Sequence, residues 1–600
     1  MSKPKNKEKK IKDFKGTFIR LCGYVLKYWY LFVPAILLTL LSNQLALLGP
    51  MYSGEAIDAI VAKEGIQYAV VQSKVVRTLV CYVASALLSY VLAVLMIIIG
   101  QRNVYTMRKQ LFEKLTTLPV GYFDTHPTGD IISRISYDID TINASLSHDV
   151  VQIMTSIYTV VGSFIFMWNI SKPLIIVVII TVPILIIFTK YRSKKVRPLF
   201  SKRSRKLGEL NGYAEEMLTG CRSIQAYNRQ EVIHSRFDKK NEEAMEAHYQ
   251  ADYHGMIMFP TINFINNLSI SLVMIFGGIL YMYSRTEVIK AGSMFFITLG
   301  GVAQFVQYSR KFAWPINEFA NIITEFQSAF SAAERVFKIL DEKPEKEDAQ
   351  GAVKLTEPEG NVKFENVVFG YDPQRTILHG ISIDAKPGTN IAVVGPTGAG
   401  KTTIISLLMR FYDTGSGNIT VDGINIRDIE RKSLRRAFTM VLQDTWLFNG
   451  TIFENIAYGK EGATLEEVKH VAKEAMIDTF IESLPDGYDT MITDDGINIS
   501  KGQRQLITIA RAMLADAKML ILDEATSNVD SRTEIKIQEA MTRLMKDKTC
   551  FIIAHRLSTI RESDVILVMK DGNVIEQGNH DELLAKGGFY AELYNSQFAK

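Results

Sequence analysis

The stretch Ile391-Ala-Val-Val-Gly395-Pro-Thr-Gly-Ala-Gly-Lys401-Thr402 decides the fold of the C-terminal part of the chain. It holds a complete G-x-x-x-x-G-K-T motif between a short apolar run and a helical pattern that begins at Thr402. Glycines in such a loop let backbone N–H groups surround phosphate oxygens, and the positive end of the following helix adds to the attraction. The sequence therefore predicts a strand, a phosphate-binding loop and a helix.

The same motif predicts roles for individual side chains. Lys401 is expected to contact the β- and γ-phosphates of a nucleotide, and Thr402 to coordinate Mg²⁺. The other loop positions expected to contact the nucleotide are Gly395, Thr397, Gly398, Gly400 and Thr403.

A second motif, Met519-Leu-Ile-Leu-Asp523-Glu524, places two carboxylates after an apolar run. The run predicts a buried strand. Asp523 suits the coordination shell of Mg²⁺, and Glu524 is positioned to act as the general base that polarises an attacking water. Acidic pairs also end strands without a catalytic role, but the phosphate-binding loop upstream favours the catalytic interpretation.

Six apolar segments dominate the N-terminal half, and most reach the ~20 residues that a helix needs to cross a bilayer. They lie at about Trp29–Leu48, Leu79–Gly100, Val150–Trp168, Leu174–Phe188, Thr261–Tyr283 and Ser293–Phe312. An even number of spans leaves both ends of the chain on one side. The lysine-rich N-terminus and the basic stretch Lys190–Lys206 predict that this side is cytoplasmic. The expected fold is an α-helical membrane domain of six transmembrane helices followed by an α/β P-loop nucleotide-binding domain.

Composition divides the chain further. In residues 1–28, a cytoplasmic or interfacial segment, Ile11, Phe14, Phe18, Leu21 and Val25 repeat at helical spacing and predict a helix at the membrane surface. Residues 29–340 form the membrane domain, whose long polar connections predict helices that continue into the cytoplasm. The acidic, proline-containing stretch 341–360 is expected to be a linker, and 361–600 the nucleotide-binding domain.

Composition also excludes some classes of protein. The chain has 600 residues, of which 47% are hydrophobic and 22% charged, so it is not a disordered chain. Its net charge of +4 gives no reason to expect a nucleic-acid partner. The four cysteines show neither metal-ligand nor disulfide-framework spacing.

Further motifs occur in a fixed order around these two. They are Tyr371 in Phe-Gly-Tyr, Gln443 in Val-Leu-Gln-Asp, Asn498-Ile-Ser-Lys-Gly-Gln-Arg-Gln505, Ser527-Asn-Val-Asp530, and His555 in Ile-Ala-His-Arg. This order and spacing resemble the nucleotide-binding domain of ATP-binding cassette (ABC) transporters. With six spans in front, the whole chain resembles an exporter-type half-transporter, and ATP with Mg²⁺ are the cofactors that the resemblance implies.

The resemblance implies roles for the remaining site residues. Tyr371 would stack on adenine, although a lone aromatic residue is more often ordinary structure. Gln443 would sense Mg²⁺ and the membrane domain, and His555 would contact the γ-phosphate, which makes Glu524, His555 and Gln443 the catalytic set and Thr402, Gln443 and Asp523 the metal set. The residues that complete the ATP site are Ser500, Gly502, Gln503 and Asp530. In the family the segment around Ser500 reaches the ATP of a partner chain, so two chains are needed for each site.

The signature segment departs from the family pattern. The consensus is Leu-Ser-Gly-Gly-Gln, whereas this chain has Ile499-Ser-Lys501-Gly-Gln503 while Glu524 and His555 are intact. Lysine adds a long charged side chain where a glycine lets the backbone approach phosphate. This combination resembles one half of a heterodimeric exporter, whose partner would have a degenerate Walker B motif and an intact signature. A homodimer that tolerates Lys501 is the alternative.

The resemblance implies ATP-driven alternating access that exports an amphipathic drug, lipid or peptide across a bacterial cytoplasmic membrane. Two alternatives remain open, an importer of exporter fold, as in some siderophore systems, and an ATP-gated channel or regulatory subunit. Intact Glu524 and His555 favour turnover over gating.

Polar residues within the spans suggest where a substrate could bind. Asn263 with Asn266 or Asn267 share one helical face of the fifth span, and Gln304, Gln307 and Lys311 share one in the sixth. They line either a substrate cavity or a helix–helix contact. Arg310 and Lys311 are expected to extend toward the inner headgroups.

Two cytoplasmic segments resemble the helical extensions that dock on ATP-binding domains. They are Tyr122–Arg134 with Asp138–Thr141, and Glu215–Gln230.

Overall fold

The structure is a computed structural model that describes residues 14–62, 65–286, 288–289, 292–372, 374–442, 445–493, 499–523, 530–553 and 560–597. The chain forms two compact units. The first comprises Met1–Thr117 and Pro127–Glu342, and the second comprises Leu118–His126 and Lys343–Lys600. The short segment Leu118–His126 thus belongs to the unit that carries the C-terminal part of the chain, although it lies between two helices of the first unit in the sequence.

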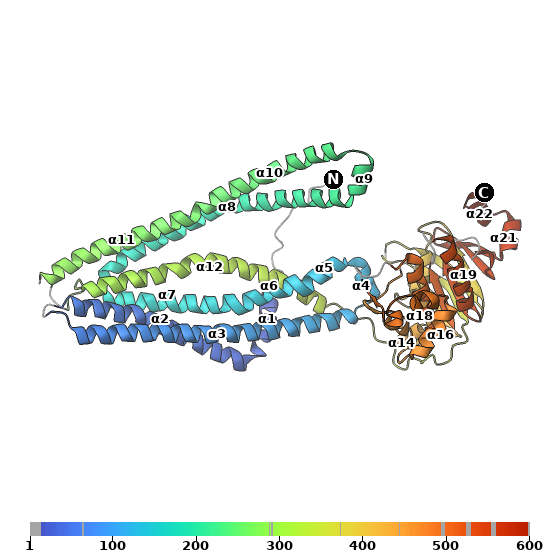
Figure 1. Ribbon diagram of the computed structural model, residues 1–600, viewed down its shortest axis with the longest axis horizontal. Coiled ribbons are helices and arrows are strands. Elements are labelled where there is room, and N and C mark those ends of the chain that lie inside the picture. Colours follow the sequence, from blue (N-terminus) through green and yellow to red (C-terminus); the bar gives the residue numbers. More distant parts are fainter. Residues whose placement is uncertain are drawn as a thin grey trace. The chain divides into compact units, whose positions relative to one another are not determined.

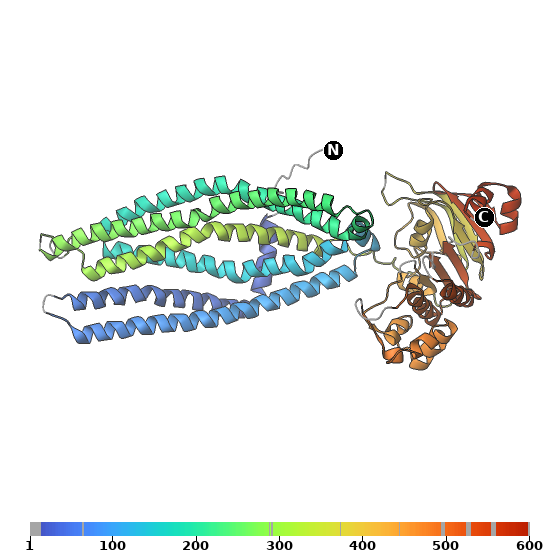
Figure 2. The ribbon, with the colours of Figure 1, turned by 45° about the horizontal axis from the view of Figure 1, so that its top comes forward.

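The secondary-structure elements of the first unit are helices, most of them long (Figure 1). These are α1 (Phe14–Leu26), α2 (Trp29–Ile60), α3 (Tyr68–Thr116), α5 (Thr128–Ser133), α6 (Ile139–Ala144), α7 (Val150–Ile170), α8 (Lys172–Thr219), α9 (Cys221–Ala226), α10 (Gln230–Met256), α11 (Met258–Arg285) and α12 (Leu299–Leu340), with π-helical turns η1 (Arg134–Asp138) and η2 (Ser145–Asp149). Helices α2 and α3 run side by side as a hairpin (Figure 2).

Five helical stretches within the described residues are long and apolar enough to cross a membrane. They are Trp29–Ile60, Tyr68–Thr116, Thr128–Ile170, Lys172–Thr219 and Gln230–Arg285. The sixth predicted span lies on α12, which begins at Leu299 instead of near Ser293. Arg310 and Lys311 make α12 less apolar than the other five, yet it packs in the same bundle. The predicted helical membrane domain is confirmed, and its number of helices agrees roughly with the six predicted spans.

Helices α2 and α12 approach each other closely because small residues face each other. A Cβ atom on Gly300 would lie 2.0 Å from the backbone oxygen of Gly54, so only glycine fits there. Gln304 Nε2 donates to the Met51 oxygen at 2.9 Å, and Gln307 Nε2 donates to Ser53 Oγ at 3.0 Å. For these two glutamines the structure therefore shows the helix–helix alternative, not a cavity lining.

The N-terminal helix α1 packs on the far end of α12. Its buried residues are Thr17, Leu21 and Val25, one turn apart, while Phe18 stays half-exposed. The Arg20 guanidinium lies 4.3 Å from the centre of the Phe337 ring. Ile11 lies outside the described residues, so the predicted apolar face can be compared with the structure only at Phe18, Leu21 and Val25.

The long polar connections are helical, as predicted. Helices α8 and α10 pair with each other and diverge from α7 and α12 toward α9 (Figure 1). Ion pairs hold the pair together: Lys206 Nζ lies 2.7 Å from Glu243 Oε2, and Arg203 Nη1 lies 2.7 Å from Asp252 Oδ1.

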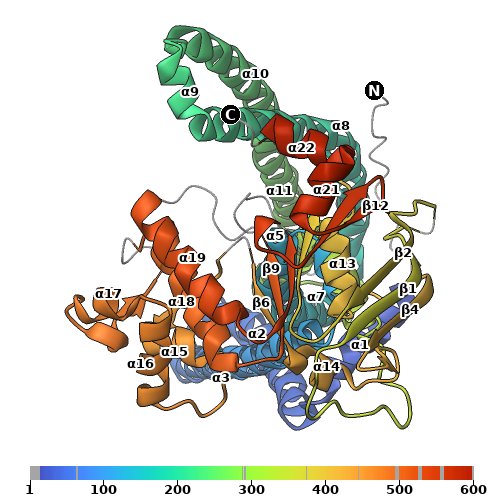
Figure 3. The same ribbon diagram turned by 90° about the vertical axis from the view of Figure 1, so that its right-hand side faces the viewer.

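The second unit contains a six-stranded sheet in the order β12-β11-β3-β10-β9-β6 and a four-stranded antiparallel sheet in the order β2-β1-β4-β5 (Figure 3). The strands are β1 (Val362–Phe369), β2 (Leu378–Ala385), β3 (Asn390–Val394), β4 (Ser416–Val421), β5 (Ile424–Asn425), β6 (Phe438–Val441), β9 (Met519–Asp523), β10 (Thr549–Ile553), β11 (Val565–Lys570) and β12 (Asn573–Gly578), with a small ladder of β7 (Gly450–Thr451) and β8 (Met491–Ile492). Strands β3, β10 and β9 consist mostly of buried apolar residues, because both faces of this parallel region are covered.

The second unit also contains helices, and all but α4 supply residues to two hydrophobic cores. They are α4 (Val120–Thr125), α13 (Lys401–Leu408), α14 (Arg431–Ala437), α15 (Ile452–Ala457), α16 (Leu465–Glu474), α17 (Asp478–Glu482), α18 (Lys501–Ala515), α19 (Ser531–Met545), α21 (His580–Lys586) and α22 (Phe589–Gln597), with the 3-10 turn η3 (Gly487–Asp489). Alternate residues of β3 enter different cores: Ala392 and Val394 one, Ile391 and Val393 the other. The predicted α/β domain is confirmed.

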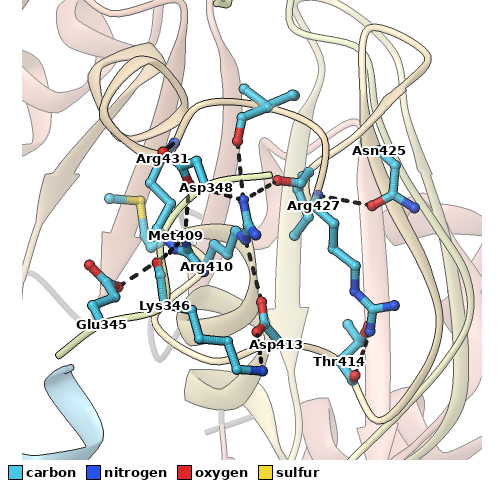
Figure 4. Close-up of polar contacts among 12 residues, drawn as sticks. Glu345, Lys346, Asp348, Met409, Arg410, Asp413, Thr414, Asn425, Arg427 and Arg431 are labelled. Carbon is cyan, nitrogen blue, oxygen red and sulfur yellow. Dashed lines mark hydrogen bonds and ion pairs between the residues drawn. The ribbon is translucent and has the colours of Figure 1, made fainter. Parts of the chain in front are cut away.

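Acidic residues in the stretch expected to be a linker contact arginines of the second unit (Figure 4). Arg431 Nη1 donates to Asp348 Oδ1 at 2.8 Å and to the Lys346 backbone oxygen at 2.6 Å. Arg435 Nη2 donates to Glu345 Oε1 at 2.5 Å. These contacts anchor the chain directly after Glu342, where the first unit ends.

Candidate nucleotide site

The loop after β3 has the geometry of a phosphate cradle. Gly395, Gly398 and Gly400 have φ angles of +152°, +85° and +99°, which residues with a Cβ rarely adopt. A Cβ on Gly395 would lie 2.2 Å from the Met569 oxygen, whereas one on Gly398 would meet nothing within 4 Å. The loop is therefore tight against β11 on one side and open on the other, where its backbone N–H groups can meet an anion.

Lys401 supplies the positive charge of this loop. It is the first residue of α13, its exposed fraction is only 8%, and its Nζ donates to the backbone oxygens of Gly395 at 2.7 Å and Pro396 at 3.1 Å. A buried ammonium folded back over a glycine loop fits a polyphosphate, because phosphate oxygens can replace these carbonyl acceptors. Beside it, Thr402 is exposed and Thr403 is buried.

Tyr371 stands beside the loop. Its hydroxyl donates to Thr403 Oγ1 at 3.4 Å, and its ring meets the rings of Phe369 and Tyr412 edge to face, with centroids 5.1 Å and 4.9 Å away. Both neighbours contact Tyr371 edge to face and do not stack on it, and 48% of Tyr371 is exposed. An exposed ring fixed next to the phosphate loop fits the predicted adenine contact.

The strand topology explains why the remaining motifs belong to one edge. Strands β3, β10, β9 and β6 are parallel neighbours, so their carboxyl ends lie at the same edge of the sheet, where ligands bind in such folds. Asp523 is the last residue of β9. Gln443, Glu524 and His555 follow the ends of β6, β9 and β10 in the sequence but lie outside the described residues.

The signature segment begins helix α18. Ser500 caps it, with its Oγ accepting from the Gln503 N–H at 3.2 Å and its own N–H donating to Gln503 Oε1 at 2.9 Å. Gly502 is buried, and Lys501 projects an exposed side chain from the first turn. This lysine stands at the positive end of the helix dipole, where a cation is unfavourable unless an anion accompanies it.

Asp530 caps another helix. Its Oδ1 accepts from the Thr533 N–H at 3.0 Å as the N-cap of α19. This backbone hydrogen bond lowers the pKa of the Asp530 carboxyl below its ordinary value. The structure thus gives Asp530 a helix-capping contact, and its predicted contact with the nucleotide stays a prediction.

The sequence motifs did not predict one contact within the second unit. It joins α4, in the segment Leu118–His126, to the C-terminal part of this unit. The Tyr412 hydroxyl donates to Asp124 Oδ2 of α4 at 2.5 Å, although 288 residues separate them. Gly121 lets the helix approach, because a Cβ there would lie 2.9 Å from the Tyr412 ring. Burial and the hydrogen bond to Asp124 raise the pKa of Tyr412 above its ordinary value. Helix α4 therefore contacts Tyr412, whose ring in turn packs against Tyr371.

For the ATP-driven transporter that the sequence resembles, we expect Tyr412→Phe to weaken the coupling between ATP hydrolysis and transport by about fivefold, since the lost hydrogen bond contributes on the order of 1 kcal/mol. The phenyl ring keeps the contact with Tyr371, so nucleotide affinity should not change. The measurement is transported substrate per ATP hydrolysed in proteoliposomes. Tyr412→Ala, which also removes the ring, should weaken nucleotide binding. Equal coupling in Tyr412→Phe and wild type would show that the hydrogen bond to Asp124 carries no signal.

A phosphate-binding ATPase fold and a bundle of membrane-crossing helices in one chain define an ATP-driven membrane transport protein. Residues 31–302 match the family model described as ABC transporter transmembrane region, and residues 378–527 match the model described as ABC transporter. An uncharacterized ABC transporter ATP-binding protein of Bacillus subtilis (strain 168), YfiC, is 40% identical over 594 residues, which cover 99% of this chain and 96% of that protein.

Two relatives with described substrates are also similar over most of their length. A fatty acid ABC transporter ATP-binding/permease protein of Mycobacterium tuberculosis (strain CDC 1551 / Oshkosh) is 41% identical, covering 89% of this chain and 83% of that protein. An ATP-dependent lipid A-core flippase of Syntrophus aciditrophicus (strain SB) is 35% identical, covering 85% and 83%.

Among solved structures, a bacterial Atm1-family ABC exporter with ATP bound is similar with a TM-score of 0.75 and 30% identity, covering 95% of this chain and 98% of that one. The chain belongs to the ABC transporter family, with the fold of its exporters. It is a multi-pass membrane protein that binds ATP in a cytoplasmic domain and couples ATP hydrolysis to transport.

Proposed function

We propose that this protein is one subunit of an exporter that moves an amphipathic, anionic lipid-like molecule out of the cytoplasm by alternating access. The observation that carries the substrate class is a cavity of about 460 Å³ between α8, α11 and α12. Apolar side chains such as Val178, Leu185, Phe259 and Phe312 form much of its wall. Such a wall fits a hydrocarbon chain.

Polar side chains also line the cavity. Asn263, Asn266 and Asn267 line it from α11, as does Arg310 from α12. Thr181 and Ser269 bond to each other at 2.8 Å across the helices, which leaves the asparagines and the guanidinium to meet a ligand. An arginine binds a carboxylate or a phosphate in a bidentate manner. Relatives named for fatty acids and for lipid A-core agree with a lipid substrate.

Arg310→Gln should test this substrate class, with Lys311→Gln as the matched control. Lys311 is the next residue of α12 but is not among the described residues that line the cavity. We expect stimulation of the ATPase in nanodiscs by oleate to fall about tenfold or more in Arg310→Gln, because the charge-assisted hydrogen bonds are lost. Stimulation by methyl oleate, which has no charge, should not change.

Oleate stimulation that survives Arg310→Gln, or falls equally in Lys311→Gln, would contradict the anionic substrate. The direction of transport is tested separately with inside-out vesicles, in which ATP-dependent accumulation is expected for an exporter. Loss of accumulation there, with uptake in the opposite orientation, would favour the importer alternative.

The ATP site is proposed to be completed by a second chain. In support, α9 has no buried residue, and the side chains that flank it, Leu218 and Tyr227, are 76% and 79% exposed. On α10 and the start of α11, Met245, Tyr249, Met256 and Phe259 form an exposed apolar stripe. Exposed stripes of this kind mark protein interfaces. Lys501 favours a different chain with an intact signature as the partner.

Within that assembly each residue has a proposed role. Thr402, Asp523 and Gln443 would hold Mg²⁺, which neutralises phosphate charge during hydrolysis. Lys401 holds the β- and γ-phosphates, Tyr371 supports adenine, Glu524 takes the proton of the attacking water, and His555 donates a hydrogen bond to the γ-phosphate. The ATP-binding domains of the two chains close around ATP because ATP binds the closed pair of domains more tightly than the open pair.

A further inference from the structure

Two π-helical turns aim aspartates at α12. Turn η1 ends at Asp138 and turn η2 ends at Asp149, and both aspartates are almost fully buried. A π-turn rotates the residues that follow it and is frequent at functional sites. At the first turn the buried charge is compensated, because Arg335 of α12 donates to both carboxylate oxygens of Asp138, at 2.8 Å and 2.5 Å.

The second turn has no such compensation. Asp149, of which 2% is exposed, faces Glu325 of α12 instead of an arginine. Its Oδ2 is buried and accepts no hydrogen bond from the described residues. Among the ion pairs of the described residues, Asp149 pairs with His148 only, and no lysine or arginine pairs with Asp149 or Glu325. A buried carboxylate beside a second carboxylate is costly unless a cation accompanies the pair.

A third ligand atom lies at the same place. His148 Nδ1 is 3.5 Å from Asp149 Oδ1, and one ligand atom each of His148, Asp149 and Glu325 lie within 4.8 Å of one another. His148 and Glu325 are exposed, so an ion can reach the buried oxygen from solvent. One imidazole and two carboxylates are ligands that zinc and its first-row neighbours accept, whereas magnesium and calcium prefer oxygen alone.

We propose that His148, Asp149 and Glu325 bind a divalent first-row transition-metal ion. The ion joins the start of α7, the third predicted span, to the cytoplasmic part of α12 in the same bundle. It shares no residue with the phosphate loop or with the cavity that contains Arg310. The site is independent of the proposed substrate and of the proposed partner chain.

The test uses the full-length transporter in nanodiscs, purified without a polyhistidine tag, treated with a chelator and titrated with Zn²⁺. We expect wild type to bind one Zn²⁺ at this site with a rise in unfolding temperature. Asp149→Asn, Glu325→Gln and His148→Ala should each lower the affinity about tenfold or more, in the range seen when metal ligation is disturbed. Substituting Co²⁺ should give visible absorption bands that shift in the same variants.

His248→Ala is the matched control, because His248 Nε2 lies 3.0 Å from Asp252 Oδ2 in a similar pair that Arg203 already neutralises. It should leave zinc binding unchanged. The exposed positions His148 and Glu325 keep the test valid if Asp149→Asn does not fold. Zinc binding equal to wild type in Glu325→Gln and His148→Ala would overturn the site. So would a wild type that binds no zinc, since the two carboxylates would then share only a proton.

Discussion

Lys401→Ala is expected to lower ATP hydrolysis by about 10²–10³-fold, because one preorganised donor to a reacting oxyanion contributes about 3 to 4 kcal/mol. The side chain is held for this role before ATP arrives: its Nζ bonds to the Gly395 and Pro396 oxygens inside the loop. Alanine leaves those carbonyls facing the phosphates with no cation between them. Nucleotide affinity should therefore fall together with turnover.

The measurement is phosphate release and binding of a fluorescent ATP analogue by the intact transporter. Lys386→Ala is the control, since Lys386 is an exposed lysine shortly before β3 and away from the loop in sequence. It should behave as wild type. If Lys401→Ala bound and hydrolysed ATP normally, the loop would not be the phosphate site that its glycines indicate.

Local sequence predicted the site wherever the function depends on consecutive residues. The loop from Gly395 to Thr402 needs three positive φ angles and a lysine at the helix start, and these leave a spaced motif. Strand β9 could be predicted from the sequence because both of its faces are buried, so the residues before Asp523 are all apolar. Long apolar runs predicted the spans for the same reason, that every side of each helix meets lipid or protein.

Contacts between distant residues left no comparable signal. Nothing in the composition around Asp124 indicates that it meets Tyr412, since the partner is set by how α4 packs. The acidic stretch expected to be a linker contains Glu345 and Asp348, which form ion pairs with Arg435 and Arg431. Periodicity correctly grouped Gln304 and Gln307 on one face, but it could not choose between a cavity and the backbone of α2.

The Asp149 site escaped prediction for a different reason. A π-helical turn changes which residues share a helical face, and the turn η2 ends at Asp149. Unusual backbone geometry of this kind is visible only in a structure.

Glu524→Gln is expected to abolish steady-state hydrolysis, with a loss of about 10²–10³-fold, because general-base catalysis contributes that much and glutamine cannot take the proton. Glu524 follows Asp523 in the sequence, and Asp523 ends β9 at the edge of the sheet that carries the phosphate loop. Glutamine keeps the shape of the side chain and removes its charge, so ATP affinity should be retained, in contrast to Lys401→Ala.

Comparing Glu524→Gln with the separate variant Lys501→Gly distinguishes the heterodimer from the homodimer. In a heterodimer whose partner lacks the catalytic glutamate, Glu524→Gln silences all turnover, while Lys501→Gly acts on the other site and changes turnover little. In a homodimer every site contains both residues, so Lys501→Gly should change the rate of each. The intact mass of the complex from native membranes decides which case applies. A complex of two copies of this chain that hydrolyses ATP at full rate would contradict the heterodimer, and full activity of Glu524→Gln would remove this residue from the reaction.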